Sequence, residues 1–452
     1  MHRWTLTVLL SVTAGIAAWL APTALGRPAP LAGPARDPGT PLEALATRDG
    51  PLDLRVAVDQ RAVPAQGVSR RYLVATISAG AAADAARLPV DLALVMDTSG
   101  SMSGSGKITE ARRAAAALVD ARGPEDAFAL IRFADRAQVV RPLGHHPKDL
   151  LRLAIGDLSP DGGTNLSEGL LAGFDEARRG SGSVRKVILM TDGQANQGVT
   201  SAEALARLAD RAGVTVSTIG VGLDFNESLL ASMADSGHGR YRYVGVGTDL
   251  TAAYADELDA AAHLVASGAR LQVEFAEGVL PQRVFQWTAD LQPHRASIAI
   301  GDLAAGQTRT VVFEVDVTPG ATVDQPLAQF SLDGAAIPDR GAFREVATVN
   351  TTVVPPGTDL APYVDRDAMT VSTRAVAGWS ALQANAAYQR GDGERGRGLL
   401  RSANTFLKEQ QRLFGLAIPE ADIQNLEALG YQDDGSAQKG AYSAARSLGR
   451  SE

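Results

Sequence analysis

Two apolar runs that each end in an aspartate constrain the fold of this chain more than any other feature of its sequence. Residues 90–97 read VDLALVMD, and residues 186–192 read KVILMTD. Neither run alternates polar with apolar residues, and stretches with helical spacing follow both of them. Continuous apolar strands that alternate with helices are typical of a parallel sheet covered on both faces. The pattern predicts an α/β domain over residues 88–265, with a Rossmann-like, doubly wound, mostly parallel sheet.

The segments on both sides of this domain alternate between polar and apolar residues. Residues 52–87 hold two runs of this kind, and residues 268–355 hold several more, separated by turns that contain Gly or Pro. Such alternation predicts antiparallel strands with one buried face. The strands of the first segment are too few to form a stable sheet alone. We therefore expect both segments to share one antiparallel β-sandwich, with the α/β domain inserted in it or flanked by it.

The C-terminal part of the chain changes to a helical pattern. Apolar residues with helical spacing lie on both sides of the glycine-rich turn GDGERGRG, so residues 362–431 predict a helical hairpin. Residues 432–452 contain few apolar residues. A segment of this kind buries too little apolar surface to offset the entropy of ordering it. We expect residues 432–452 to be a disordered tail.

The N-terminal residues have the pattern of an export signal. A short basic start precedes the apolar run at residues 4–21, and the small-x-small tripeptide at residues 24–26 suits a signal peptidase. This predicts a signal peptide at residues 1–26; the alternative is an uncleaved membrane anchor, because the run is just long enough to span a bilayer. Residues 27–51 are rich in Pro, Ala and Gly and predict a flexible linker. We expect an exported protein that is periplasmic, secreted or held at the cell surface.

Composition narrows the possible functions. The formal net charge of −8 argues against a nucleic-acid-binding protein, which would normally present a basic surface. The sequence contains no cysteine, which excludes disulfides, thiolate zinc sites and cysteine nucleophiles. The stretch GSMSGSGK fails as a phosphate-binding loop, because Ser101 replaces its first glycine and Ile108 replaces its Ser or Thr.

Two aspartates lie where the two apolar runs end. Asp97 closes the first run and Asp192 the second, and the carboxyl ends of neighbouring parallel strands meet at one edge of a sheet. Two carboxylates brought together there would repel unless a cation lay between them. Hydroxyl groups add further oxygen atoms. The complete candidate set for the cation is Asp97, Ser99, Ser101, Thr164 and Asp192.

These residues offer carboxylate and hydroxyl oxygens, which suit Mg²⁺ first and Mn²⁺ or Ca²⁺ after it. Gly100 relieves the steric limit on the loop that turns the hydroxyls of Ser99 and Ser101 toward one point. The protein supplies at most five oxygens to the ion. An octahedral ion therefore keeps an open position that an incoming carboxylate can fill. The alternative is that both aspartates cap helices or turns, which leaves the hydroxyl-bearing residues unexplained.

The same residues resemble a known family. DTSGSM, the threonine of GGTN and the aspartate of TDG match the three-part signature of von Willebrand factor type A domains, and GGTNL and TDGxAN are similar to its bacterial exported branch. The resemblance covers about residues 90–265. It implies a metal-ion-dependent adhesion site in which the candidate residues hold the ion and an Asp or Glu of a partner protein completes its shell.

The resemblance and the residues together favour a binding module without enzymatic activity. We expect an adhesion or scaffold protein whose ion captures an acidic residue of a protein partner, with no nucleic-acid partner and no membrane contact except through an uncleaved N-terminal anchor. A metal-dependent hydrolase would need a general base or a second metal beside the ion, and no His or Glu is obviously placed for this. A structural envelope protein, in which the metal only stabilises the fold, is the other alternative.

Overall fold

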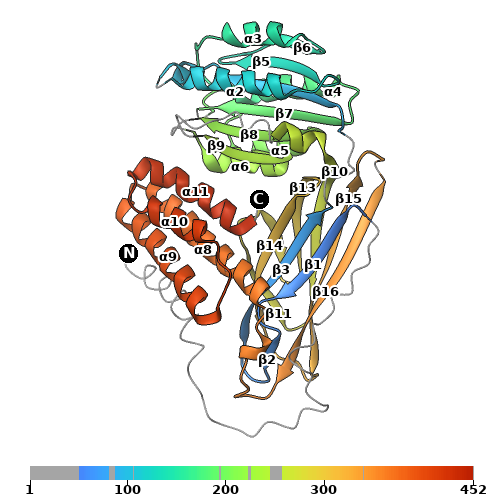
Figure 1. Cartoon of the computed structure of the whole chain (residues 1–452), viewed down its shortest axis with the longest axis vertical. Coiled ribbons are helices and arrows are strands. Elements are labelled where there is room, and N and C mark those ends of the chain that lie inside the picture. The colour runs from blue at the N-terminus through green and yellow to red at the C-terminus, as the bar shows by residue number, and fades with distance from the viewer. Residues whose placement is uncertain are drawn as a thin grey trace.

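The protein combines an α/β domain, a β-sandwich and a group of C-terminal helices. The computed structural model describes residues 50–80, 87–104, 106–192, 195–221, 225–244, 257–339 and 341–450. The α/β domain lies at one end of the elongated sandwich, and the helices lie along one side of the sandwich (Figure 1). The expected signal peptide and nearly all of the expected linker lie outside the described residues. Among the described residues, no helix is both long and apolar enough to cross a lipid bilayer.

The α/β domain is built on a six-stranded sheet in the order β6-β5-β4-β7-β8-β9. The strands are β4 (Val90–Asp97), β5 (Ala127–Phe133), β6 (Ala137–Gly144), β7 (Val184–Thr191), β8 (Thr215–Val221) and β9 (His238–Val244). All neighbours are parallel except β5 and β6. The strand order reverses between β4 and β7. The carboxyl ends of these two strands therefore form the crevice where open α/β sheets bind ligands.

Helices cover both faces of this sheet, which explains why its central strands are apolar throughout. The helices include α2 (Lys107–Ala121), α3 (Lys148–Gly156), α4 (Leu166–Arg178), α5 (Ala202–Asp210) and α6 (Glu227–Ser236). Residues 257–262 are helical as well and pack in the same cluster as α2. Leu94 of β4 packs in a hydrophobic cluster with α2 and α3. The next residue, Val95, packs in a second cluster with α4, α5 and α6. Every residue of β4 is buried as a result.

The two segments of alternating residues form one β-sandwich, as expected. One sheet has the order β1-β3-β14-β11 and the other β12-β13-β10-β15-β16-β2. The strands are β1 (Leu52–Val58), β2 (Ala62–Pro64), β3 (Ser69–Ala79), β10 (Leu264–Phe275), β11 (Val279–Val284), β12 (Ala289–Gln292), β13 (Arg295–Ala304), β14 (Thr308–Val317), β15 (Asp324–Ala336) and β16 (Ala342–Val354). β3 pairs with β14, with Leu73 opposite Phe313. The α/β domain is thus inserted into the sandwich between β3 and β10.

Aromatic rings fill the centre of the sandwich. Phe313 of one sheet lies between two rings of the other, with ring centroids 5.9 Å from Phe275 and 5.7 Å from Phe330. Both pairs are edge-to-face, which is a favourable arrangement of aromatic quadrupoles. All three rings belong to one hydrophobic cluster that spans both sheets. The inserted domain therefore stands on a sandwich with a continuous core of its own.

In the described part of the chain, four α-helices follow the sandwich rather than the two of the expected hairpin. They are α8 (Arg366–Gln389), α9 (Gly393–Phe414), α10 (Glu420–Leu429) and α11 (Asp434–Arg450). The expectation of a disordered tail at residues 432–452 is wrong, because most of that segment forms α11. Ala437, Ala441 and Ala445 recur at helical spacing and are buried against the alanines of α8. Small side chains let two helices pack closely, so α11 is ordered despite its low apolar content.

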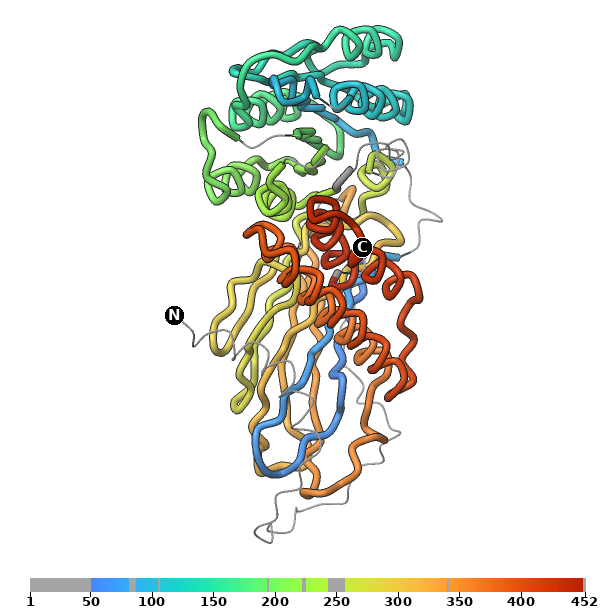
Figure 2. Tube along the Cα trace, turned by 90° about the vertical axis from the view of Figure 1, so that its left-hand side faces the viewer, coloured from blue at the N-terminus to red at the C-terminus, as the bar shows by residue number. Residues whose placement is uncertain are grey.

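Helix α11 also contacts the inserted domain. Arg446 pairs with Asp235 at the end of α6 at 3.1 Å, and the ring of Tyr442 lies edge-on to Tyr241 of β9, with centroids 5.7 Å apart. Figures 1 and 2 both place α11 where the C-terminal helices meet the α/β domain. Among the described residues, α11 therefore holds the α/β domain in addition to the direct contacts between this domain and the sandwich, such as the hydrogen bond from Thr215 to Asp302.

Candidate metal centre

Asp97 lies at the carboxyl end of β4, beside the point where the strand order reverses. Its carboxylate is fully buried and accepts hydrogen bonds from the backbone N–H of Ser99, at 2.7 Å, and from the hydroxyl of Thr191. Burial raises the pKa of Asp97 and the negative charge of Asp192 adds to this, whereas the bonds from Thr191 and Ser99 act in the opposite direction. Within the described ranges, Asp97 makes no salt bridge. A buried carboxylate without a counter-charge is costly, so this position favours a cation.

Asp192 follows β7 directly and is also fully buried. Its Oδ1 accepts a hydrogen bond of 2.8 Å from the hydroxyl of Ser101, and that hydroxyl lies 2.9 Å from the hydroxyl of Ser99. Because Ser99 is also bonded to Asp97, a continuous set of short contacts joins four of the five candidate ligands. The first and third motif segments therefore meet as the sequence predicted.

Thr164 is brought to the same edge by its loop. The carbonyl of Gly162 accepts a hydrogen bond of 3.0 Å from the N–H of Gly100, which fastens this loop to the one after β4. The N–H of Thr164 donates to the side-chain oxygen of Asn196 at 2.9 Å, which fastens it to the loop after β7. Thr164 is buried. In the described part of the structure, no hydrogen bond joins its hydroxyl to the other four candidates, so its place in the site is set by the backbone of the three loops.

Lys107 also belongs to this edge, although the motif pattern does not point to it. It is the first residue of α2, and its Nζ donates a hydrogen bond of 2.7 Å to Oδ2 of Asp192. The only signal in the sequence is a lysine at the start of the helix that follows Asp97. Its contact depends on the helix beginning at that residue, which sequence patterns place only to within a few residues.

The side chains at this edge suit a hard divalent cation. They present carboxylate and hydroxyl oxygens, the donors that Mg²⁺ prefers. Asp97 and Asp192 bring two buried carboxylates together, and only Asp192 has a cationic side chain bonded to it among the described residues. The remaining negative charge and the hydroxyls of Ser99 and Ser101 would suit an ion such as Mg²⁺, which the five candidate residues could hold.

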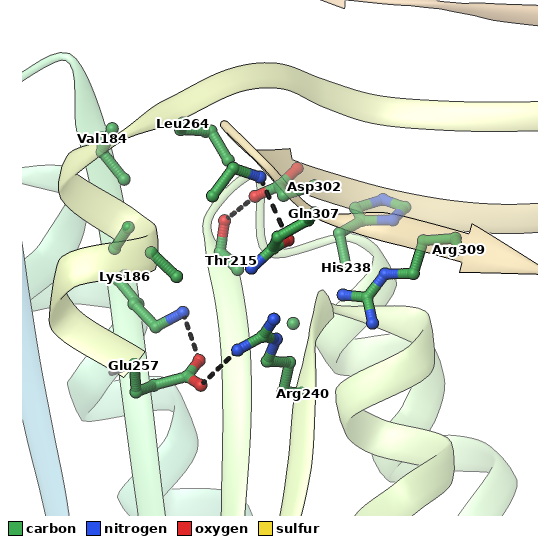
Figure 3. Close-up of a pocket in the computed structure, with 14 residues that line it drawn as sticks. Val184, Lys186, Thr215, His238, Arg240, Glu257, Leu264, Asp302, Gln307 and Arg309 are labelled. Carbon is green, nitrogen blue, oxygen red and sulfur yellow. Dashed lines mark hydrogen bonds and ion pairs between the residues drawn. The ribbon is translucent and has the colours of Figure 1, made fainter. Parts of the chain in front are cut away.

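A cavity lies at the other edge of the sheet, between the amino-terminal ends of β7, β8 and β9 and the sandwich (Figure 3). Glu257 pairs there with Lys186 at 2.7 Å and with Arg240 at 3.9 Å. Burial acts to raise the pKa of Glu257, but the charges of Lys186 and Arg240 outweigh it and lower the pKa to about 2. Thr215 donates a hydrogen bond to Asp302 of the sandwich. None of the candidate ligands lines this cavity. Its polar groups come from both domains, and the bond from Thr215 to Asp302 joins the α/β domain to the sandwich.

The doubly wound sheet, with two aspartates and two serines gathered where its strand order reverses, places this domain among the α/β domains whose ligand crevice lies at a strand-order reversal. Residues 91–254 match the family model of the von Willebrand factor type A domain. The chain therefore contains a von Willebrand factor type A domain, as the motif resemblance implied, and the match covers the whole metal edge.

Other comparisons extend beyond this domain. The chain is 27% identical over 244 residues to the uncharacterised Escherichia coli protein YfbK, a match that covers 50% of this chain and 41% of that protein. The chain thus spans less than half of the length of this curated relative. Its fold is similar to the solved structure of a von Willebrand factor type A protein from Catenulispora acidiphila, with a TM-score of 0.67, 17% identity, and coverage of 88% of this chain and 98% of that chain. It is also similar to the ArnB paralog VWA2 from Sulfolobus acidocaldarius, with a TM-score of 0.60, 16% identity, and coverage of 88% and 99%. These two likenesses show that the overall fold recurs.

Proposed function

We propose that this protein is an exported, metal-dependent protein-binding module without enzymatic activity. A divalent cation, Mg²⁺ first, would be held by Asp97, Ser99, Ser101, Thr164 and Asp192. An Asp or Glu of a partner protein would complete its shell. The observation that carries the proposal is the buried carboxylate of Asp97, which makes no salt bridge in the described part of the chain and lies beside two serine hydroxyls. The proposal of export rests on the sequence pattern of residues 1–26.

The residues around the ion would position it and leave the partner's carboxylate room to bind. Thr191 and the backbone of Ser99 hold the carboxylate of Asp97 in one orientation, and Ser101 does the same for Asp192. The ion supplies a concentrated positive charge at the mouth of the crevice. Because the whole protein carries a net charge of −8, broad electrostatic capture of an acidic partner is disfavoured. Recognition would therefore depend on one acidic side chain that reaches the ion.

Titration calorimetry with MgCl₂ and MnCl₂ tests the metal site. We expect one ion to bind the wild-type protein and none to bind Asp97→Ala. Asp149→Ala is a matched control, because Asp149 lies on α3 with a side chain that is 89% exposed, and it should bind the ion as the wild type does. Equal binding by wild type and Asp97→Ala would overturn the assignment.

Capture from an envelope extract tests the partner. Immobilised protein should retain a partner in Mg²⁺, release it in chelator and fail to retain it as Asp97→Ala. The contrary outcome is that the wild type binds the ion while the same proteins are retained in Mg²⁺, in chelator and by Asp97→Ala. In that case the ion stabilises the fold and does not contact the partner.

A further inference from the structure

Lys107 places a positive charge inside the metal site. Its Nζ lies 2.7 Å from Oδ2 of Asp192, and the two side chains are 9% and 0% exposed. The preceding residue, Gly106, has a φ of 73°, a left-handed conformation that glycine adopts readily, and α2 starts directly after it. Because Cα–Cβ bonds in a helix tilt toward its N-terminus, a side chain at this position points back toward the loop that follows Asp97. The start of α2 therefore delivers the ammonium group to the metal edge.

This position is an unfavourable one for a lysine in two respects. The N-terminus of a helix carries a partial positive charge, which disfavours a cation there. Burying an ammonium group also costs free energy unless a counter-charge compensates it. The carboxylate of Asp192 is such a counter-charge, and it too is buried. Lys107 thus has a direct electrostatic interaction with a proposed metal ligand.

The contact changes both the geometry and the charge of the site. With Oδ2 bonded to Lys107 and Oδ1 facing Ser101, Asp192 has one oxygen on the side of the two serines. Asp97, Asp192 and Lys107 together carry one negative charge. A divalent ion bound beside these three residues brings the sum of their charges to one positive charge, whereas the sum without Lys107 would be zero. An uncompensated positive charge attracts a carboxylate more strongly than a neutral site does.

We propose that Lys107 determines the balance between two affinities, weakening the binding of the divalent ion and strengthening the binding of a carboxylate to the protein that holds the ion. The inference rests on the proposed function, because it concerns the same ion and the same incoming acidic group. It adds that the carboxylate of the partner approaches positively charged groups. It also adds that Lys107 supplies the counter-charge of Asp192 when the ion is absent.

The test compares Lys107→Met, which keeps the length of the side chain and removes its charge, with Lys107→Arg, which keeps the charge. Lys148→Met is the matched control, because Lys148 is the first residue of α3 and donates to the backbone carbonyl of Asp120 instead of to a ligand. Calorimetry measures Mn²⁺ affinity. Water-proton relaxation of the Mn²⁺-loaded protein then measures acetate affinity, since acetate displaces a water from the ion.

We expect Lys107→Met to bind Mn²⁺ about tenfold more tightly and acetate about tenfold more weakly, since a unit charge a few ångströms away is worth at least that factor. Lys107→Arg should lie closer to the wild type than Lys107→Met in both affinities, because it keeps the charge. Lys148→Met should keep both wild-type affinities, because Lys148 contacts no proposed ligand. In chelator, Lys107→Met should unfold at a lower temperature than the wild type, and Mn²⁺ should reduce that difference.

Two outcomes are distinguishable. If the wild type binds Mn²⁺ and acetate and Lys107→Met leaves both affinities unchanged, the inference about Lys107 is wrong and the proposed function stands. If the wild type binds no Mn²⁺, the proposed function itself fails. A Lys107→Met variant that does not fold leaves Lys107→Arg to decide, because full retention of both affinities supports a role of charge and their loss contradicts it.

Discussion

The ammonium group of Lys439 lies 2.8 Å from a carboxylate oxygen of Glu227, and both side chains are only 2% exposed. The same Nζ donates a hydrogen bond of 2.8 Å to the carbonyl of Phe225 and lies 4.1 Å from the centroid of its ring. Glu227 is the first residue of α6, which follows the carboxyl end of β8. This buried pair therefore fastens α11 to the inserted domain on the side of the sheet that carries the metal edge.

Breaking this pair from one side should destabilise the protein. Lys439→Met leaves Glu227 buried without its counter-charge, and such a loss costs about 3–5 kcal/mol of the free energy of unfolding. The double variant with Glu227→Gln should recover much of the loss. Chemical denaturation gives these values. Lys408→Met is the control, because Lys408 and Glu427 form an exposed pair with side chains 51% and 50% exposed, and its loss should change little. An equal effect of both lysine substitutions would contradict the role of the buried pair.

Two glycine substitutions in the C-terminal helices should have opposite effects. A Cβ on Gly378 of α8 would lie 2.8 Å from the carbonyl oxygen of Ala445 in α11, so Gly378→Ala must push the helices apart. We expect a loss of about 1–3 kcal/mol, as for other overpacked sites. A Cβ on Gly398 of α9 would meet nothing within 4 Å, and Gly398→Ala should stabilise the protein by up to about 1 kcal/mol. Thermal unfolding of both variants checks the sign of each effect, and stabilisation by Gly378→Ala would contradict the close packing of α8 against α11.

Asp97→Asn should reverse the order of stability between metal-free and metal-loaded protein. In chelator, the amide removes a buried charge that has no salt bridge in the described ranges, so the variant should melt above the wild type. In excess Mg²⁺, the wild type should gain stability from the bound ion and the variant should not. Melting curves with chelator and with Mg²⁺ provide the comparison. The same Mg²⁺-dependent gain in both proteins would mean that the ion binds elsewhere.

The free energy of unfolding should depend on pH through the carboxyl group of Asp59, which lies between β1 and β2. Burial raises the pKa of Asp59 to about 6 from its ordinary value of 3.8, with the charge of Arg71 acting in the opposite direction. Between these two values the folded protein holds a proton that the unfolded chain has released. The free energy of unfolding should therefore decrease as the pH rises through this window, by up to about 3 kcal/mol from this group.

Comparing the wild type with Asp59→Asn isolates this dependence from that of the other acids. The difference in free energy of unfolding between the two proteins, measured in denaturant at pH 4, 5, 6 and 7, should change between pH 4 and 6 and level off above it. A difference that is constant across the series would show that Asp59 has an ordinary pKa in the folded protein.

Much of the architecture could be predicted because burial leaves a direct mark on the sequence. Strand β4 is covered on both faces, so VDLALVMD is apolar without alternation, and its final Asp97 could be placed at the ligand edge. Leu73 and Phe313 lie on the faces of β3 and β14 that form the core of the sandwich, and the alternation around them identified both strands. Their neighbours Val74 and Val312 are buried as well, because α8 covers the outer face of this sheet.

The parts that could not be predicted depend on close contacts between distant segments. Alanine contributes little to a hydrophobicity pattern, so the packing of Ala437, Ala441 and Ala445 against α8 gave no sign of an ordered helix. The hydrogen bond from Lys107 to Asp192 depends on the residue at which α2 begins. A shift of that start by one residue would turn the side chain of Lys107 away from Asp192. Contacts of this kind become visible only when the segments are placed in three dimensions.

The attachment of the inserted domain to the sandwich and to α11 has a consequence for the entropy of association. A module on a single linker samples many orientations, and it must give up this rotational freedom when it docks within a larger assembly. Here that freedom is lost when the chain folds, before any partner arrives. The direction in which Asp97 and Asp192 face is thereby set relative to the long axis of the sandwich. A partner anchored at a matching distance and angle would lose less entropy on binding than one that must first orient a freely rotating domain.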